Sequence, residues 1–273
     1  MAGKKALCVG INNFKNYPSN ALQGCVNDAN DMEALIIKYM GFSKADIVKL
    51  TDSSATKENI IKNLKEMVEG AKAGKYDNLV FSMSSHGTQM PDTNGDEPDK
   101  SDEAFCPHDL AAKGNVWDPS KIIIDDELHD LFVQLPENVN LEVYLDTCHS
   151  GTGLKAMEPN PDRQPRYMPP PSIDAFESSK DMSPKGNQPM LNEAASNHIL
   201  WAACKSDQTS ADANIAGNWH GAFTYYFNKA VNDNQNKLSR DEILKLVVSD
   251  LKKGKYTQIP QLECDATSRG KEI

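Results

Sequence analysis

The chain has 273 residues, 39% of them hydrophobic and 25% charged, which is enough apolar sequence for one large α/β domain and excludes a disordered protein. Its formal charge is −10, from 29 basic and 39 acidic residues. Because nucleic-acid binding needs a basic face, we expect no nucleic-acid partner, whereas cationic ligands are compatible with this charge.

The cysteines and the apolar segments indicate the compartment. The six cysteines are widely spaced, without a C-x-x-C pair, so they predict neither a disulfide framework nor a zinc site. The first apolar stretch ends at Ile11 and is too short for a signal-peptide core, and no later segment reaches membrane-spanning length. We therefore predict a cytoplasmic protein with reduced thiols and no membrane contact.

The first third of the chain alternates between strand-like and helix-like patterns. Short apolar runs predict strands, and apolar positions at helical spacing predict the segments between them. The expected elements are a strand at 5–11, a helix from Asn27-Asp28 to Gly41, a strand at 47–50, a helix at 56–70 and a strand at 78–83.

The middle of the chain is more polar. We expect a long acidic loop over residues 89–120, a short helix that opens at Asp125-Asp126-Glu127, and a strand over 140–145. Residues 155–193 are rich in proline and have little apolar periodicity. They predict an exposed linker or a mobile loop.

The last part returns to the alternation. A strand is expected at 198–203, a helix at 222–231, a helix that starts near Ser239 with a Ser-x-x-Glu capping box, and an edge strand at 259–264. Strands that alternate with helices predict a mostly parallel sheet with helices on both faces.

Two short segments directly follow neighbouring strands and carry the chemistry. Ser84-Ser85-His86-Gly87 follows the strand that ends at Met83, and Asp146-Thr147-Cys148-His149-Ser150-Gly151 follows the strand that ends at Leu145. The carboxyl ends of parallel strands share one crevice, so His86 and Cys148 are expected to meet there. A histidine that takes the proton of a thiol, whose thiolate then attacks a carbonyl, predicts a cysteine peptidase.

The same turns suggest the remaining catalytic roles. The backbone amides of Gly87 and Cys148 are candidate donors to the oxyanion of a tetrahedral intermediate. His149 is the competing candidate for the base. Because adjacent residues after a strand point to opposite sides, we assign the base to His86.

In these turns the chain resembles the caspase-like cysteine peptidases, specifically the metacaspases and orthocaspases. The resemblance covers nearly the whole chain. Its further motifs are Ala6-Leu7-Cys8-Val9-Gly10-Ile11-Asn12, Leu22-Gln23-Gly24-Cys25-Val26-Asn27-Asp28-Ala29, Ile124-Asp125-Asp126-Glu127-Leu128, Ala203-Cys204-Lys205-Ser206-Asp207-Gln208-Thr209-Ser210-Ala211-Asp212 and Gly221-Ala222-Phe223-Thr224.

The resemblance implies a fold and a division of the chain. The fold is an α/β, caspase-like three-layer sandwich in which helices flank a mostly parallel six-stranded sheet on both faces. Residues 1–154 correspond to the large-subunit-like region, residues 155–193 to a linker, and residues 194–273 to the small-subunit-like region of one domain. It also implies a monomer without an organic cofactor.

The resemblance further implies hydrolysis of peptide bonds after Arg or Lys. Asp28 and Asp146 match positions that line the family's acidic S1 pocket, with Cys25 and Ser84 beside them. Paired carboxylates can bind a guanidinium in bidentate fashion. The alternative for Asp28 is that it caps its helix.

Calcium activation is a second implication. The matching aspartates are Asp125, Asp126 and, in the acidic loop, Asp102, and such oxygen ligands suit Ca²⁺. Lys155 departs from the pattern, because it places a cation where the family has a further aspartate. The alternative is that Asp125 and Asp126 only begin their helix.

The linker contains basic residues at which an Arg/Lys-specific enzyme could cleave itself. They are Lys155, Arg163, Arg166, Lys180 and Lys185. We predict such self-processing, and the alternative is an inert spacer.

Two other functions compete with an Arg/Lys-specific endopeptidase. The first is a caspase-like scaffold or regulator that binds basic peptides without cutting them, against which the intact His–Cys pair argues. The second is a separase- or gingipain-like peptidase, which shares the dyad and differs in its choice of substrate.

Overall fold

The computed structural model describes residues 3–91, 101–148, 160–174 and 198–273. Its centre is a six-stranded sheet with the order β14-β11-β9-β3-β1-β2. All neighbours in it are parallel except β14, which runs antiparallel at one edge. The strands are β14 (Gln261–Glu263), β11 (His198–Ala202), β9 (Asn140–Asp146), β3 (Tyr76–Ser84), β1 (Gly3–Gly10) and β2 (Ile47–Thr51). The predicted mostly parallel six-stranded sheet and its edge strand within residues 259–264 are thus confirmed, and the antiparallel direction of that strand is added by the structure.

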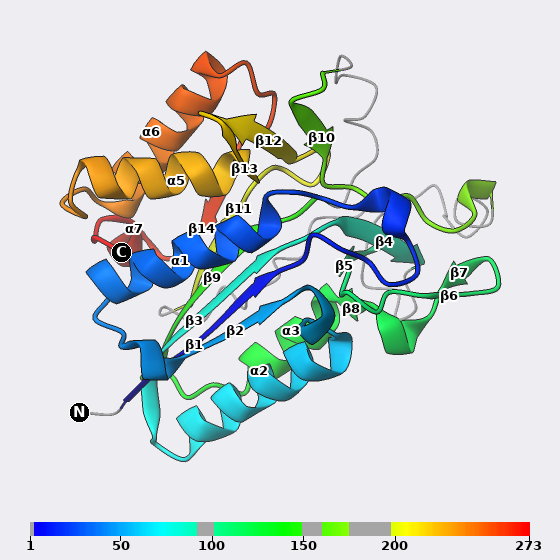
Figure 1. The fold of residues 1–273 in the computed structure, drawn as a ribbon. Coiled ribbons are helices and arrows are strands. Elements are labelled where there is room, and N and C mark those ends of the chain that lie inside the picture. Colours follow the sequence, from blue (N-terminus) through cyan, green and yellow to red (C-terminus); the bar gives the residue numbers. More distant parts are fainter. Residues whose placement is uncertain (1–2, 92–100, 149–159, 175–197) are drawn as a thin grey trace.

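Helices cover both faces of this sheet (Figure 1). One face carries α1 (Cys25–Tyr39), α5 (Ala222–Asp233) and α6 (Arg240–Lys253), and the short α7 (Ala266–Arg269) follows β14. The opposite face carries α2 (Lys57–Lys72) and α3 (Asp125–Phe132). The strand β1 divides its side chains between the two resulting cores, with Leu7 and Val9 in one and Ala6 and Cys8 in the other. Burial on both faces explains why the strand is apolar from Ala6 to Val9.

In the part of the chain that the structure describes, three smaller sheets lie outside the central one. The first has the order β4-β5-β8, the second β10-β12-β13, and the third pairs β6 with β7. Their strands are β4 (Gly87–Pro91), β5 (Ser101–Phe105), β8 (Ile123–Ile124), β10 (Arg163–Pro165), β12 (Ala211–Ile215), β13 (Asn218–Gly221), β6 (Ala112–Lys113) and β7 (Val116–Trp117). Short 3-10 helices occur at Pro18–Asn20, Lys44–Asp46, Asp52–Ser54 and Pro119–Lys121.

The structure corrects three sequence-based expectations. The helix α1 begins at Cys25 after a glycine N-cap, so Asp28 lies inside its first turn rather than at the cap. The expected loop at 89–120 contains β5, β6, β7 and part of β4, because β5 pairs with both β4 and β8 and because β6 pairs with β7. The expected exposed linker contains β10, because residues 163–165 pair with β12. Other parts of the linker lie outside the described residues.

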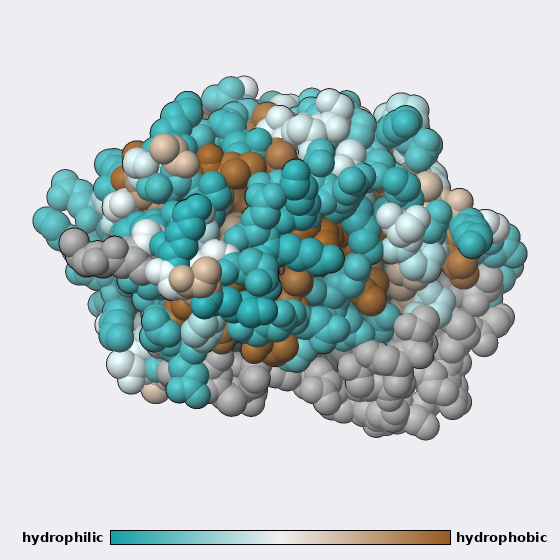
Figure 2. All heavy atoms as spheres, turned by 90° about the horizontal axis from the view of Figure 1, so that it is seen from below, coloured by the Kyte–Doolittle hydropathy of each residue, from teal (hydrophilic) through white to brown (hydrophobic). Residues whose placement is uncertain are grey.

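Both ends of the chain supply strands to the central sheet, which takes β1, β2, β3 and β9 from residues 1–154 and β11 and β14 from residues 194–273. The division into large- and small-subunit-like regions stays a prediction. The predicted capping box at α6 is confirmed, since Ser239 and Glu242 exchange hydrogen bonds. Seen from below, on the side where α2 lies, the surface is mainly hydrophilic with small separate apolar patches (Figure 2). Within the described ranges, no helix combines the length and hydropathy that crossing a bilayer requires.

Candidate active site

The two predicted catalytic turns meet at the carboxyl edge of the central sheet. In the parallel pair β3–β9, Ser84 pairs with Asp146, so His86 and Cys148 each lie two residues beyond this pair. The turns touch directly, because a Cβ atom added to Gly87 would lie 2.1 Å from the carbonyl oxygen of Cys148. Glycine at this position therefore permits the close approach of the two turns.

The histidine is held as a neutral imidazole. Its Nε2 atom lies 2.8 Å from the carbonyl oxygen of Asn20. Since a carbonyl oxygen can only accept, Nε2 carries the proton and Nδ1 keeps its lone pair. Nδ1 is buried and has no hydrogen-bond partner among the residues described. Burial lowers the pKa of His86 to about 4, so the imidazole is neutral at pH 7 and its Nδ1 atom carries a lone pair.

The nucleophile candidate is fully buried in this conformation. The Cys148 Sγ donates a hydrogen bond to the carbonyl oxygen of Gln208 at 2.9 Å, so the sulfur is present as a thiol. Cys148 also packs with Tyr167 and Cys204. A hydrogen bond with Cys148, together with burial, raises the pKa of the Cys204 thiol well above its ordinary value. The Cys204 thiol is therefore protonated at neutral pH.

The predicted acidic pocket contains an arginine of the same chain. Arg166, which follows β10, is fully buried. Its guanidinium lies 2.7 Å from a carboxylate oxygen of Asp28, 3.0 Å from one of Asp212 and 3.3 Å from one of Asp146. It also donates to the main-chain carbonyl of Asp146 at 3.1 Å. Asp28 therefore binds a cation instead of capping its helix.

Asp212 is the third carboxylate of the pocket. It lies in the family motif that begins at Ala203, but no role in the pocket was predicted for it. It lies on β12, far from Asp28 and Asp146 in the sequence, and the backbone amides of Gln23 and Gly24 donate to its carboxylate at 2.8 and 3.0 Å. These bonds fix the carboxylate in place. The only sequence signal for it was its position in the stretch that begins at Ala203.

The other two carboxylates are also fixed by neutral donors. Asp146 accepts from the Ser210 hydroxyl at 2.6 Å and from the Thr224 amide and hydroxyl at 3.0 and 2.8 Å. Asp28 accepts from the Gly221 amide at 2.9 Å. Such bonds orient each oxygen without neutralising its charge, so the pocket stays attractive to a cation.

Glycine is required at one wall of the pocket. A Cβ atom on Gly221 would lie 2.1 Å from an Asp146 carboxylate oxygen and 2.5 Å from the Arg166 Nη1 atom. Of the remaining predicted pocket residues, Cys25 is fully buried near the charged cluster, and burial raises the pKa of its thiol although Arg166 opposes that effect. Ser84 is buried and pairs with Asp146 across the sheet.

The main chain around Arg166 is also bound to the two catalytic turns. The Arg166 amide donates to the Ser210 carbonyl at 2.9 Å, and the Gly87 amide donates to the Arg166 carbonyl oxygen at 2.9 Å. The Met168 amide then donates to the Gly87 carbonyl at 2.9 Å. The segment Arg163–Met168, which we call the strap, thus pairs with β12 through β10 and bridges to Gly87 through Tyr167; Figure 1 shows β10 beside β12.

This arrangement places the main-chain carbonyl group of Arg166 next to Gly87 in the first catalytic turn. The Gly87 amide, predicted as an oxyanion donor, already donates to the carbonyl of the residue whose side chain fills the acidic pocket. The role of the Cys148 amide as the second donor stays a prediction. His149 lies outside the described residues.

The predicted calcium ligands lie close in the fold. Asp125 and Asp126 directly follow β8, whose Ile124 pairs with Ala104, two residues after Asp102. Within the described ranges, however, no three His, Cys, Asp or Glu side chains are grouped to hold a metal ion. Lys155 and the acidic residues at 92–100 lie outside the described ranges. The described residues therefore do not by themselves supply three side-chain ligands to one calcium ion.

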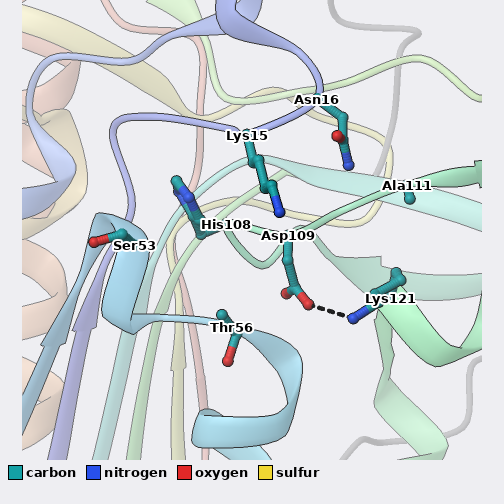
Figure 3. Close-up of a pocket in the computed structure, with 8 residues that line it drawn as sticks. All are labelled: Lys15, Asn16, Ser53, Thr56, His108, Asp109, Ala111 and Lys121. Carbon is teal, nitrogen blue, oxygen red and sulfur yellow. Dashed lines mark hydrogen bonds and ion pairs between the residues drawn. The ribbon is translucent and has the colours of Figure 1, made fainter.

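A separate pocket of about 540 Å³ lies beside the N-terminus of α2 (Figure 3). Asp109 and Lys121 form an ion pair of 2.8 Å across it. Its lining residues are Lys15, Asn16, Ser53, Thr56, His108, Asp109, Ala111 and Lys121. None of the predicted catalytic or pocket residues lines it, so we do not assign the catalytic chemistry to it.

Comparison with known proteins identifies the family. The sequence profile of the metacaspase, peptidase C14 domain matches residues 4–157. The chain is 31% identical over 295 residues to metacaspase-1 of Pyricularia oryzae, covering 96% of this chain and 71% of that protein. It is 34% identical over 296 residues to metacaspase-1 of Meyerozyma guilliermondii, covering 95% of this chain and 68% of that protein.

Two solved structures resemble the fold. A structural-genomics protein from Geobacter sulfurreducens has a TM-score of 0.70 at 27% identity, over 99% of this chain and 97% of that one. Caspase-1 from Spodoptera frugiperda has a TM-score of 0.58 at 11% identity, over 96% of this chain and 88% of that one, and supports the fold alone. The profile match and the relatives more than 30% identical place the chain in the metacaspase family of cysteine peptidases.

Proposed function

We propose that the protein is an endopeptidase that cleaves protein and peptide substrates after Arg or Lys, with Cys148 as nucleophile and His86 as base. One observation carries the proposal. The side chain of Arg166 fills a pocket of three carboxylates while its carbonyl oxygen accepts a hydrogen bond from Gly87. A substrate with arginine before the cleaved bond would make the same contacts.

The charges in the pocket favour arginine over other residues. Its three carboxylates come from three different elements, and the planar guanidinium donates to several of them at once. Lysine has a single ammonium and makes fewer of these bonds, so we expect weaker cleavage after lysine. Aspartate is excluded, because its charge would be buried next to like charges.

The proposed reaction begins when the thiol leaves the Gln208 carbonyl and gives its proton to Nδ1 of His86. The thiolate then attacks the substrate carbonyl carbon, forming a C–S bond, while the negative charge on the oxygen is stabilised by the Gly87 amide. The C–N bond breaks, and the imidazolium gives its proton to the departing amine. Water, activated by His86, hydrolyses the thioester and restores the thiol.

We also propose that the chain processes itself, and the bond between Arg166 and Tyr167 is the favoured position. Its carbonyl is the one that the Gly87 amide contacts. Arg163, the other basic candidate in the described part of the linker, lies three residues earlier. Lys155, Lys180 and Lys185 lie outside the described residues.

Calcium activation through Asp102, Asp125 and Asp126 stays a prediction. If it operates, addition of a chelator lowers peptidase activity, and Asp126→Asn reduces the response to added Ca²⁺. Cytoplasmic location, a monomeric state and the absence of nucleic-acid and membrane partners likewise stay predictions from the sequence.

A binder of basic peptides without catalysis is the second candidate. The specific observation in its favour is that Cys148 donates to Gln208 while the pocket is filled. The two candidates differ in one property, since only the peptidase releases a new amine from a bound peptide.

The deciding experiment measures hydrolysis of matched fluorogenic peptides that end in Arg, Lys or Asp. Each is assayed with millimolar Ca²⁺ and with chelator, in the parent protein, in Arg166→Gln, and in both backgrounds with Cys148→Ala. Cys204→Ala serves as the control for loss of a neighbouring buried thiol. We expect cleavage after Arg that Cys148→Ala abolishes and Cys204→Ala retains. Binding of Arg peptides without cleavage in any folded variant would support the non-catalytic binder instead.

A further inference from the structure

The strap contains a second arginine, Arg163, whose side chain is also bound. In an extended strand alternate residues share a face, so Gln164 and Arg166 lie on one face of the strap and Arg163 on the other. The contacts agree, because both Gln164 and Arg166 donate to the Asp212 carboxylate, at 2.9 and 3.0 Å. Arg163 therefore occupies a different site from the acidic pocket.

This second site is built at the carboxyl end of α6. The Arg163 guanidinium donates to the carbonyl oxygens of Gly254 at 2.7 Å and Lys255 at 3.0 Å. Its central carbon lies 4.0 Å from the centroid of the Tyr256 ring. Terminal helix carbonyls carry the negative end of the helix dipole, and an aromatic face attracts a cation, so both features select positive charge.

The position of Tyr256 depends on its neighbours. A Cβ atom on Gly254 would lie 2.7 Å from the Tyr256 ring and 2.8 Å from the Tyr226 hydroxyl. The two tyrosine rings meet edge to face, with centroids 6.0 Å apart. The ring that receives the Arg163 guanidinium is thus held by packing rather than free on the surface.

We propose that this site is a second cation-binding subsite of the peptide cleft, which we call the α6 subsite. It would select an arginine three positions before the arginine of the acidic pocket. The strap is then an internal peptide that fills both sites, with Arg163 at the α6 subsite and Arg166 in the acidic pocket. This inference rests on the proposed function, since it extends the specificity of the same cleft.

The ligand is defined by its backbone as well as by its charges. Residues 163–165 pair antiparallel with β12 in the register Arg163 to Ala213, Gln164 to Asp212 and Pro165 to Ala211. A peptide added to β12 as a strand would gain main-chain hydrogen bonds, while its side chains supply the specificity. The chemical class of ligand is therefore an extended peptide with the pattern Arg-x-x-Arg.

The test measures binding of labelled peptides to a chain with an emptied cleft. Cys148→Ala prevents cleavage, and the paired changes Arg163→Ala and Arg166→Ala remove the internal competitors from the α6 subsite and from the acidic pocket. Fluorescence anisotropy then compares the peptides Arg-Gln-Pro-Arg, Ala-Gln-Pro-Arg and Arg-Gln-Pro-Ala. We expect loss of the first arginine to weaken binding about tenfold. Loss of the last arginine should weaken it about a hundredfold or more, because that arginine meets three buried carboxylates.

A matched pair of variants identifies the subsite. Tyr256→Leu removes the aromatic face and should reduce the preference for the first arginine to about twofold or less, whereas Tyr256→Phe keeps the ring and should retain it. If Arg166→Ala does not fold, Arg166→Gln leaves a side chain of similar length in the pocket. As a further check in the full-length Cys148→Ala chain, the losses of melting temperature in Arg163→Ala and Tyr256→Leu should be less than additive when combined.

The outcomes separate the two proposals. Equal affinity for Arg-Gln-Pro-Arg and Ala-Gln-Pro-Arg, or additive losses of melting temperature, would overturn the α6 subsite and leave the acidic pocket intact. Equal affinity for Arg-Gln-Pro-Arg and Arg-Gln-Pro-Ala would instead overturn the proposed Arg specificity. An unchanged preference in Tyr256→Leu would place recognition of the first arginine elsewhere.

Discussion

Removal of Arg166 should raise the affinity of the enzyme for added Arg substrates. In the structure this side chain occupies the acidic pocket completely, so an external arginine must first displace it. A tethered ligand acts at an effective concentration of the order of 1 mM. If the isolated strap peptide bound with a Kd of about 100 µM, within the usual range for substrates, the internal competitor would raise the apparent KM about tenfold.

The variants Arg166→Gln and Arg166→Ala should therefore lower KM about tenfold, with little change in kcat, because the competitor blocks binding and not the chemical step. The assay is the initial rate of hydrolysis of an Arg-terminated fluorogenic peptide over a range of concentrations. Lys62→Ala, at an exposed cation on α2, is the control for loss of one positive charge. An unchanged KM in a folded Arg166 variant would refute the idea that the strap competes with substrate.

The same change should lower stability. Arg166 balances three carboxylates in a buried cluster, and loss of one partner from a buried ion pair costs about 3–5 kcal/mol. Urea unfolding monitored by circular dichroism should register this loss in Arg166→Ala. A peptide with arginine, added to the variant, should restore part of it, because a ligand that binds only the folded state stabilises that state.

Three other changes test the site. Asp212→Asn removes one carboxylate and should raise KM for Arg peptides by about tenfold or more in the Arg166→Gln background, with kcat retained, as measured by steady-state kinetics. Gly221→Ala should abolish binding of Arg peptides in an anisotropy assay, because its methyl group would occupy the guanidinium position, and normal binding would contradict the pocket assignment. Burial lowers the pKa of His86 to about 4, below the value of about 6.5 in an unfolded chain, so the unfolded state binds the proton more readily between these values. The unfolding free energy is thus highest above pH 6.5 and falls by up to about 3.4 kcal/mol as the pH drops through 4. His86→Asn should flatten that part of the curve of unfolding free energy against pH.

The sequence alone was sufficient to predict the central sheet, and it singled out candidate catalytic residues whose roles stay predictions. Apolar runs that alternate with amphipathic segments predict a parallel sheet, because side-chain periodicity is a local property of the chain. Parallel strands also place the residues that follow their carboxyl ends at one edge of the sheet. For that reason the sequence predicted that His86 and Cys148 lie near each other. The family motifs added Asp28 and Asp146 as pocket residues, and the structure places both on one guanidinium.

Only the tertiary structure shows that Arg166 fills the acidic pocket and that Asp212 is its third carboxylate. Asp212 joins Asp28 and Asp146 only because β12 folds over the sheet edge, and pairing between distant strands leaves no periodic trace in the sequence. The proline-rich composition around Arg166 predicted exposure, since local propensity does not register the ion pairs that a distant pocket offers. Burial of the charged Arg166 is favourable only when all three carboxylates are already assembled, which is a property of the folded protein and not of any one segment.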